Sequence, residues 1–281
     1  MGNCIYCHKP AGPLRKAHKD CENIFVAGKD SVRHLVANAI VTSRDMTDLE
    51  NEINSTAASH YVDENSRRDL LISAWGQAVD SFLDQDPSNQ VVPEYLNEMR
   101  KHFDLSQQEL DVSGAYSRML KWAVLQDLLE GTIPDRLSIV GTLPFNFQKN
   151  ETLVWLFQDV SYYERRTVTR YVGRSHGASV RVAKGLYVRS GAFQGHPVKT
   201  DQVVQVDTGM VAITTNHIYF AGLAKSFRVN YNKIVSFEPF VDALGIQRDA
   251  QTAKPQVFVT GDGWFTYNLV VNLVERLHCG S

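Results

Sequence analysis

The chain has few cysteines, no long apolar run and almost no net charge, and each shortage excludes a class of protein. Four cysteines in 281 residues are too few for a scaffold built on disulfides, which favours a reducing compartment. No run of about eighteen apolar residues exists, and the first residues lack the apolar core of a signal peptide. The net charge of −2 means that the chain as a whole is not a polycation of the kind that binds nucleic acid through its overall charge. We therefore expect a cytoplasmic protein without a transmembrane segment.

Catalytic motifs are lacking as well. The sequence contains no G-x-S-x-G elbow, no Walker loop and no G-x-G-x-x-G after a predicted strand. An EF-hand calcium-binding loop that began at Asp84 would need glycine at its sixth position and glutamate at its twelfth position. The chain has Asn89 and Tyr95 at these two positions, so the calcium site is rejected. These absences predict a protein that is not an enzyme. An unrecognised hydrolase is the weaker alternative.

Metal-ligating residues are concentrated near the start of the chain. Three cysteines and one histidine form the pattern C-x2-C-x10-H-x2-C, made by Cys4, Cys7, His18 and Cys21. A C-x2-C turn directs two thiolates to one point, and residues three apart lie on one face of a helical turn. Three thiolates and one imidazole are typical of a closed, structural Zn²⁺ site. His8 is a competing ligand, but it directly follows Cys7 and would need a tighter chelate.

This arrangement resembles a small treble-clef finger within residues 1–27, with a cysteine knuckle, a hairpin around residues 9–13 and a helix that begins near Arg15. The resemblance implies a structural zinc ion. It leaves the purpose open, because such fingers bind nucleic acid in some proteins and only brace a terminus in others. Four basic side chains belong to the finger, namely Lys9, Arg15, Lys16 and Lys19. They provide either a phosphate-facing surface or ordinary solvation.

Residues 28–140 have the pattern of a helical bundle. Apolar residues recur at helical spacing, above all over residues 110–130, which follow the capping box Ser106-x-x-Glu109. Between Asp30 and Asp111, sixteen acidic residues stand against six basic ones, a local balance of −10. We expect these helices to present a solvated acidic face or to meet a basic surface elsewhere in the chain.

After Pro144 the apolar period changes to two, and β-branched and aromatic residues predominate. This pattern predicts a series of short strands over residues 153–259. An amphipathic helix follows over residues 264–277, with Trp264 and Phe265 among the side chains available for its apolar face. Asp262 stands where it can cap the first turn of that helix.

Residues 209–220, with the sequence GMVAITTNHIYF, resemble the strand-turn-strand signature of GRAM and bacterial PH-like domains. The stretches 226–229 and 233–238 are similar to the strands that follow in that family. The resemblance covers residues 205–277 and implies a PH-like antiparallel barrel or sheet closed by a C-terminal helix. It carries over no catalytic or lipid-binding residue. The predicted fold class is α+β, with a zinc finger at 1–27, a helical bundle at 28–140 and a PH/GRAM-like β-domain at 141–281.

A basic run in the β-domain is the candidate ligand-binding surface. From Arg165 to Lys199 the chain has eight Lys or Arg and no Asp or Glu. The candidate ligand-binding residues within it are Arg166, Arg170, Arg174 and Arg181. Strand alternation places Arg166 and Arg170 on one face. The PH-like resemblance implies phosphorylated headgroups or peptides as ligands, while packing on the acidic helices or simple solvation is the other interpretation.

The predicted function is therefore recognition of a ligand or protein partner by a non-enzymatic zinc-containing protein. The ligand is left open among an anionic lipid headgroup at a peripheral membrane contact, a peptide and another protein. The alternative is a nucleic-acid-binding protein that uses the finger and the arginine-rich strands. Cys279 lies apart from the other cysteines and has no assigned role.

Overall fold

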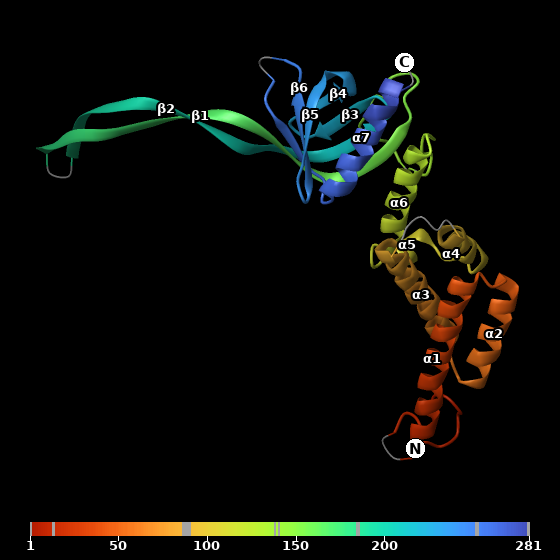
Figure 1. Cartoon of the computed structure of the whole chain (residues 1–281). Helices are drawn as coiled ribbons and strands as arrows, with labels where there is room; N and C mark the ends of the chain where they lie inside the picture. The colour runs from red at the N-terminus through yellow and green to blue at the C-terminus, as the bar shows by residue number, and fades with distance from the viewer. Residues whose placement is uncertain are drawn as a thin grey trace. The chain divides into compact units, whose positions relative to one another are not determined.

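A computed structural model describes residues 2–12, 15–85, 91–137, 139, 141–183, 186–250 and 253–279, without the side chains of 85, 166–201 and 277–279. The chain divides into two compact units, Met1–Ala123 and Val124–Ser281. Figure 1 shows that the first is helical and that the second contains the sheet. The predicted α+β class is confirmed. No described helix combines the length and apolar character that a membrane span requires.

The first unit is built from helices around one apolar core. Its helices are α1 (Lys19–Thr42), α2 (Met46–Ser59), α3 (Glu64–Gln85), α4 (Val91–His102), α5 (Gln107–Leu110) and the first part of α6 (Ala115–Leu129). Val36 of α1, Leu49 of α2 and Leu96 of α4 are fully buried in this core. A Cβ atom on Gly28 would lie 2.3 Å from His60 Cβ, so any larger residue at this position would collide with His60. The glycine therefore allows α1 to pass close to the end of α2.

Two boundaries in this unit differ from the predicted ones. The finger helix and the first bundle helix are one continuous helix, because α1 runs across the boundary predicted between residues 27 and 28. The single helix predicted over residues 110–130 is interrupted between α5 and α6. Asp111 accepts a hydrogen bond from the Ser117 N–H (2.8 Å), which satisfies one of the first amides of α6. The capping box Ser106-x-x-Glu109 is confirmed at the start of α5.

The second unit is a seven-stranded antiparallel sheet with a helix packed against it (Figure 1). The strand order is β4-β3-β2-β1-β7-β6-β5. The strands are β1 (Leu153–Ala183), β2 (Leu186–Thr214), β3 (His217–Gly222), β4 (Ser226–Asn230), β5 (Ile234–Pro239), β6 (Ala243–Arg248) and β7 (Gln256–Val259). A short 3-10 helix, η1 (Tyr231–Lys233), joins β4 to β5, and α7 (Gly263–Cys279) packs against β5 and β6.

The first two strands are much longer than predicted. Several short strands were expected between residues 153 and 214, but β1 and β2 pair continuously from Leu153 opposite Thr214 to Ala183 opposite Leu186, apart from local register shifts. In the described backbone, β1 pairs with β7 over residues 161–164, and β2 pairs with β3 over residues 209–213. Beyond Glu164 the two strands continue as a two-stranded ribbon, visible in Figure 1. We call residues 165–203 the ribbon.

A β-bulge in β1 directs its side chains into the core. The register shifts between Phe157 and Val160, and Asp159 has a positive φ of 53°. Because of this bulge, Phe157, Val160 and Tyr162 are all buried, although strict alternation would turn Phe157 and Val160 to opposite faces. The ring of Tyr162 lies 5.3 Å from the ring of Phe258 in β7, centroid to centroid.

One face of α7 completes the core of the sheet unit. Phe265 and Leu269 are buried, and the Phe265 ring lies 4.8 Å from the Trp155 ring of β1. Asp262 accepts a hydrogen bond from the Phe265 N–H (3.0 Å), which confirms the predicted cap. Trp264 was expected on the same apolar face, but its side chain is 67% exposed. That expectation was wrong because the buried residues of α7, which include Phe265, Thr266, Leu269 and Val270, lie on one side of the helix, and at about 100° per residue Trp264 falls on the other side.

Candidate metal centre

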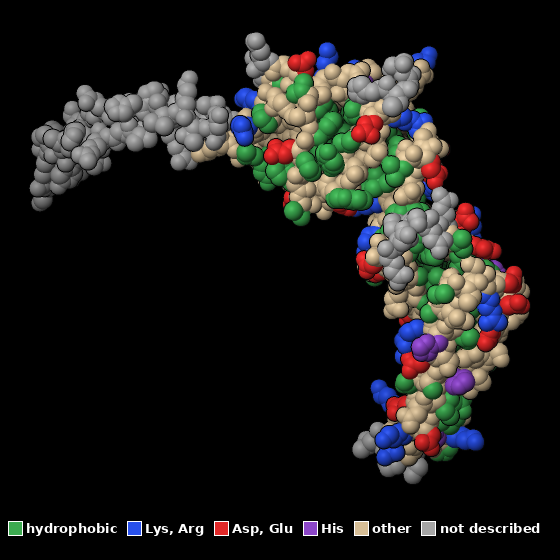
Figure 2. All heavy atoms as spheres, viewed as in Figure 1, with side chains coloured by type: hydrophobic (Ala, Val, Ile, Leu, Met, Phe, Trp, Pro, Cys, Tyr) green, Lys and Arg blue, Asp and Glu red, His purple; other side chains and the backbone are tan. Residues whose placement is uncertain are grey.

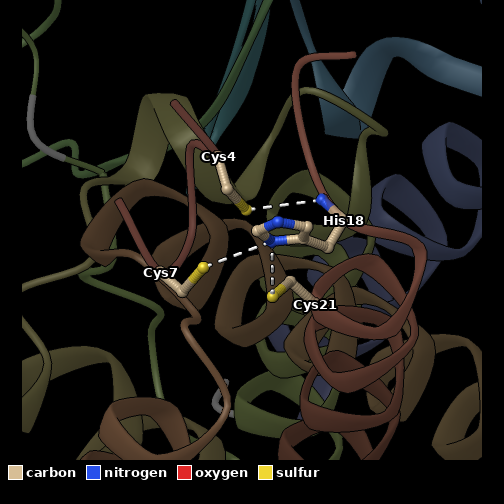
Figure 3. A group of neighbouring side chains, drawn as sticks. All are labelled: Cys4, Cys7, His18 and Cys21. Carbon is tan, nitrogen blue, oxygen red and sulfur yellow. Dashed lines mark hydrogen bonds between the residues drawn. The ribbon is translucent and has the colours of Figure 1, made fainter. Parts of the chain in front are cut away.

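Cys4, Cys7, His18 and Cys21 come together beside the first turn of α1 (Figure 3). Their ligand atoms all lie within 4.8 Å of one another. The Nδ1 atom of His18 is 3.4 Å from the sulfur of Cys7 and 3.7 Å from the sulfur of Cys21. The prediction that these four residues form one cluster is confirmed, and their arrangement is compatible with a metal site.

Backbone hydrogen bonds shape the knuckle that carries the first two cysteines. The Cys4 N–H donates to Lys9 O (2.8 Å), and Cys4 O accepts from the His8 N–H (2.9 Å). The Ala11 N–H donates to Gly2 O (3.0 Å), which closes a small hairpin. His8 adopts a left-handed conformation with φ 57° and is exposed. The competing ligand therefore lies outside the four-residue cluster.

His18 is held by the hairpin in the orientation that a metal ligand needs. It is the N-cap of α1, which begins at Lys19 rather than near Arg15 as predicted. Its Nε2 lies 3.0 Å from Pro10 O, and a carbonyl oxygen only accepts, so the ring proton is on Nε2. The Nδ1 atom then carries a lone pair, and this atom is the one that faces the cysteine sulfurs. The bond to Pro10 and the Cys7 thiol both raise the pKa of His18.

The thiols of Cys4 and Cys21 have pKa values that are shifted in opposite directions. Burial raises the pKa of Cys4, but backbone amides outweigh this effect and lower its pKa to about 6. Burial and the neighbouring sulfurs of Cys7 and Cys4 raise the pKa of Cys21 to about 11. Thiolates this close repel one another, so the donor set suits a divalent cation that compensates their charge.

Aromatic contacts tie the cluster to the helical unit. Cys4 and Cys21 are buried together with two small residues, Ala11 and Ala17. The ring of Tyr6, which packs against this group, lies 4.9 Å from the ring of Phe25 in α1 and 6.1 Å from that of Tyr61. Order at the four-residue cluster is therefore coupled to packing along α1.

The predicted ligand-binding arginines all lie on β1. The backbone register places them in the ribbon opposite β2, at Arg166, Arg170, Arg174 and Arg181. Their side chains lie outside the described part of the structure. An anion site formed by these four residues therefore stays a prediction.

A buried polar network in the sheet unit has no signal in the sequence pattern. Glu151, just before β1, has a side chain that is only 1% exposed. It accepts hydrogen bonds from His217 Nδ1 and from the Tyr219 hydroxyl (2.8 Å). The Asn230 amide group lies 3.1 Å from His217 Nε2. Since these groups are packed inside the sheet unit, they fasten the chain before β1 to β3.

No protein-family model, no curated protein and no solved structure matches the chain.

Proposed function

We propose that the four-residue cluster binds one zinc ion in a structural role. Three sulfurs and one imidazole nitrogen within 4.8 Å make the donor set of closed tetrahedral zinc sites. The hydrogen bond from His18 Nε2 to Pro10 O is the outer contact that orients a metal-ligating histidine. Four protein ligands leave no position for a reactive water, so the ion holds the knuckle against α1 and activates nothing.

Metal content tests this proposal. Purified protein is expected to contain one zinc ion per chain, measured by mass spectrometry of the metal against protein concentration. The double variant Cys4→Ala/Cys21→Ala is expected to lose the ion and to exchange the amide hydrogens of the knuckle faster, because binding and local folding are coupled. His8→Ala is the matched control and keeps the ion, since His8 lies outside the cluster. Full zinc content in the double variant would refute the assignment.

We propose for the whole chain a non-enzymatic role, in which a PH-like sheet domain recognises an anionic partner. The observation that carries this is the ribbon: β1 and β2 continue beyond the sheet, and the sequence of residues 165–199 contains eight Lys or Arg and no Asp or Glu. An isolated two-stranded ribbon is only marginally stable in water, so a partner that contacts its basic side chains would stabilise it. The antiparallel strand order and the packing of α7 on β5 and β6 support the PH-like resemblance.

Nucleic acid is the second candidate partner, and the shape of the ribbon favours it. The major groove of duplex DNA admits a two-stranded β-ribbon. Lysine and arginine side chains along such a ribbon would displace counterions from the phosphates, which makes binding strongly dependent on salt.

Binding to two kinds of anionic surface distinguishes the candidates. The probes are vesicles that contain phosphatidylserine and short duplex DNA, each titrated at low and high salt. The test variant reverses charge on the ribbon with Arg166→Glu, Arg170→Glu and Arg174→Glu. The control makes the same change in net charge at exposed lysines outside the ribbon, with Lys149→Glu, Lys233→Glu and Lys254→Glu. We expect binding to be lost in the ribbon variant alone, and equal losses in both would contradict a specific role of the ribbon.

A further inference from the structure

Three large apolar side chains are exposed where the β5–β6 turn meets the start of α7. Val241 is 96% exposed, Trp264 67% and Phe240 41%. The Gly263 N–H donates to Val241 O (3.1 Å), so the two segments lie side by side. Figure 2 shows exposed hydrophobic side chains over the sheet unit. We call Phe240, Val241 and Trp264 the Trp264 patch. Large apolar side chains that are exposed next to one another mark interaction surfaces.

The chain segments that carry the Trp264 patch are acidic. Over residues 234–247 and 255–274, the chain has three carboxylates and no Lys, Arg or His. These carboxylates are Glu238, Asp242 and Asp262, and the first two are exposed. A surface with apolar anchors and an acidic rim is complementary to a basic segment that also carries apolar residues.

The chain itself contains such a segment. Residues 165–199 have eight basic residues, no acidic ones, and apolar residues interspersed among them, including Val168, Tyr171, Val180 and Phe193. We propose that the Trp264 patch of one copy docks the ribbon of a second copy. This deepens the proposed function, on which it rests, because it names a second copy of the chain as an anionic partner of the ribbon.

The course of β1 shows why the docked ribbon belongs to another copy. Ala243, at the end of the β5–β6 turn, pairs with Val259, and Val259 pairs with Ser161 of β1. The Trp264 patch is therefore near the Ser161 end of this part of the sheet. Glu164 pairs with Gln256, farther from the patch, and the ribbon begins beyond Glu164. The ribbon thus leaves the sheet in the direction away from the patch of its own copy.

A contact of this kind is heterologous, because each copy contributes two different surfaces. After the first contact the pair still has one free ribbon, on the first copy, and one free patch, on the second, so association continues until a ring closes or a filament forms. The attraction between a basic ribbon and an acidic rim is screened by salt. Trp264 is the expected anchor, because exposed tryptophan residues that become buried dominate the energy of interfaces.

Sedimentation velocity of the 281-residue chain tests the proposal. The natural protein is expected to self-associate at low salt and to dissociate at high salt. Val241→Ser/Trp264→Ser is expected to raise the apparent Kd at least about tenfold, the effect of losing one anchoring side chain at an interface. Its melting temperature is expected to stay close to that of the natural protein, because both side chains are largely exposed. Leu223→Ser is the control, since Leu223 is fully exposed in the turn between β3 and β4 and should not affect association.

Mixing two defective variants gives the decisive measurement. The patch variant, Val241→Ser/Trp264→Ser, keeps an intact ribbon, and the ribbon variant with reversed charge at three arginines keeps an intact patch. Each alone is expected to be monomeric, whereas an equal mixture is expected to form a one-to-one dimer. A natural protein that stays monomeric, a patch variant that associates as the natural protein does, or a mixture that stays monomeric would overturn the proposal.

The same samples separate this proposal from the proposed function. The patch variant is expected to bind vesicles or duplex DNA at least as tightly as the natural protein, because its ribbon is unchanged and is no longer occupied by a second copy. If it binds them while the mixture stays monomeric, docking between copies is refuted and anion recognition stands. If the mixture dimerises while the natural protein binds neither probe at any salt concentration, docking stands and recognition of those two anionic surfaces is refuted.

Discussion

Replacement of Phe265 by alanine measures how much the closing helix contributes to the sheet unit. The Phe265 side chain is 1% exposed, and its ring lies 4.8 Å from the Trp155 ring and 6.1 Å from the Phe157 ring. Replacing a buried phenylalanine with alanine removes the favourable free energy of transferring its ring from water into the core, and it leaves a cavity. Together these effects lower the free energy of unfolding by about 3–5 kcal/mol. Two aromatic contacts are lost as well, so we expect a value near the middle of that range, about 4 kcal/mol.

The neighbouring residue provides a matched control. Trp264 is the next residue back along the chain, is larger and is 67% exposed. Trp264→Ala is therefore expected to change the free energy of unfolding by no more than about 0.5 kcal/mol. Size and hydrophobicity alone would predict the opposite ranking of the two variants, because tryptophan is the larger apolar side chain.

Thermal unfolding followed by circular dichroism measures both variants without relying on tryptophan fluorescence. In a unit of roughly 150–250 residues, each kcal/mol shifts the Tm by about 2–4 °C, so Phe265→Ala is expected to lower it by roughly 8–16 °C. Hydrogen exchange of the amides in β1 and α7 assigns the transition to the sheet unit. Equal losses in the two variants, or a loss below about 1 kcal/mol for Phe265→Ala, would refute the placement of α7 on the sheet.

Two further predictions concern buried or paired carboxylates. Glu151→Ala is expected to cost about 2–4 kcal/mol in urea unfolding, because it leaves the His217 and Tyr219 donors without an acceptor. Glu151→Gln keeps an acceptor and is expected to cost clearly less, so equal losses would contradict the network. Arg68 holds the pKa of Glu109 at about 2, below its ordinary value of 4.5. This pairing therefore stabilises the folded protein above about pH 4.5, and the contribution is lost as pH falls from there towards 2. Arg68→Met is expected to raise the pKa of Glu109 in a carboxyl-detected NMR titration, and an unchanged pKa would contradict the pairing.

Features that depend on short stretches of chain could be predicted from the sequence. The four metal-cluster residues lie within residues 4–21, and the spacing of Cys4 and Cys7 and of His18 and Cys21 already limits how far apart their ligand atoms can be. The capping box of α5 and the Asp262 cap of α7 were predicted for the same reason, since a cap involves residues only three apart. The helical middle and the sheet-forming second half follow from apolar periods of 3.6 and 2.

Only the tertiary structure decided the features that depend on distant partners. A period of two marks strands but does not set their length, and β1 and β2 form one long hairpin because each supplies the other's hydrogen bonds. Phe265 rather than Trp264 enters the core because Trp155, far away in the sequence, lies on the side that α7 faces. The burial of Glu151 likewise depends on side chains from β3. Local spacing therefore determined the cluster of three cysteines and one histidine and the helix caps, whereas contacts between distant segments determined the ribbon, the buried network and the exposed patch.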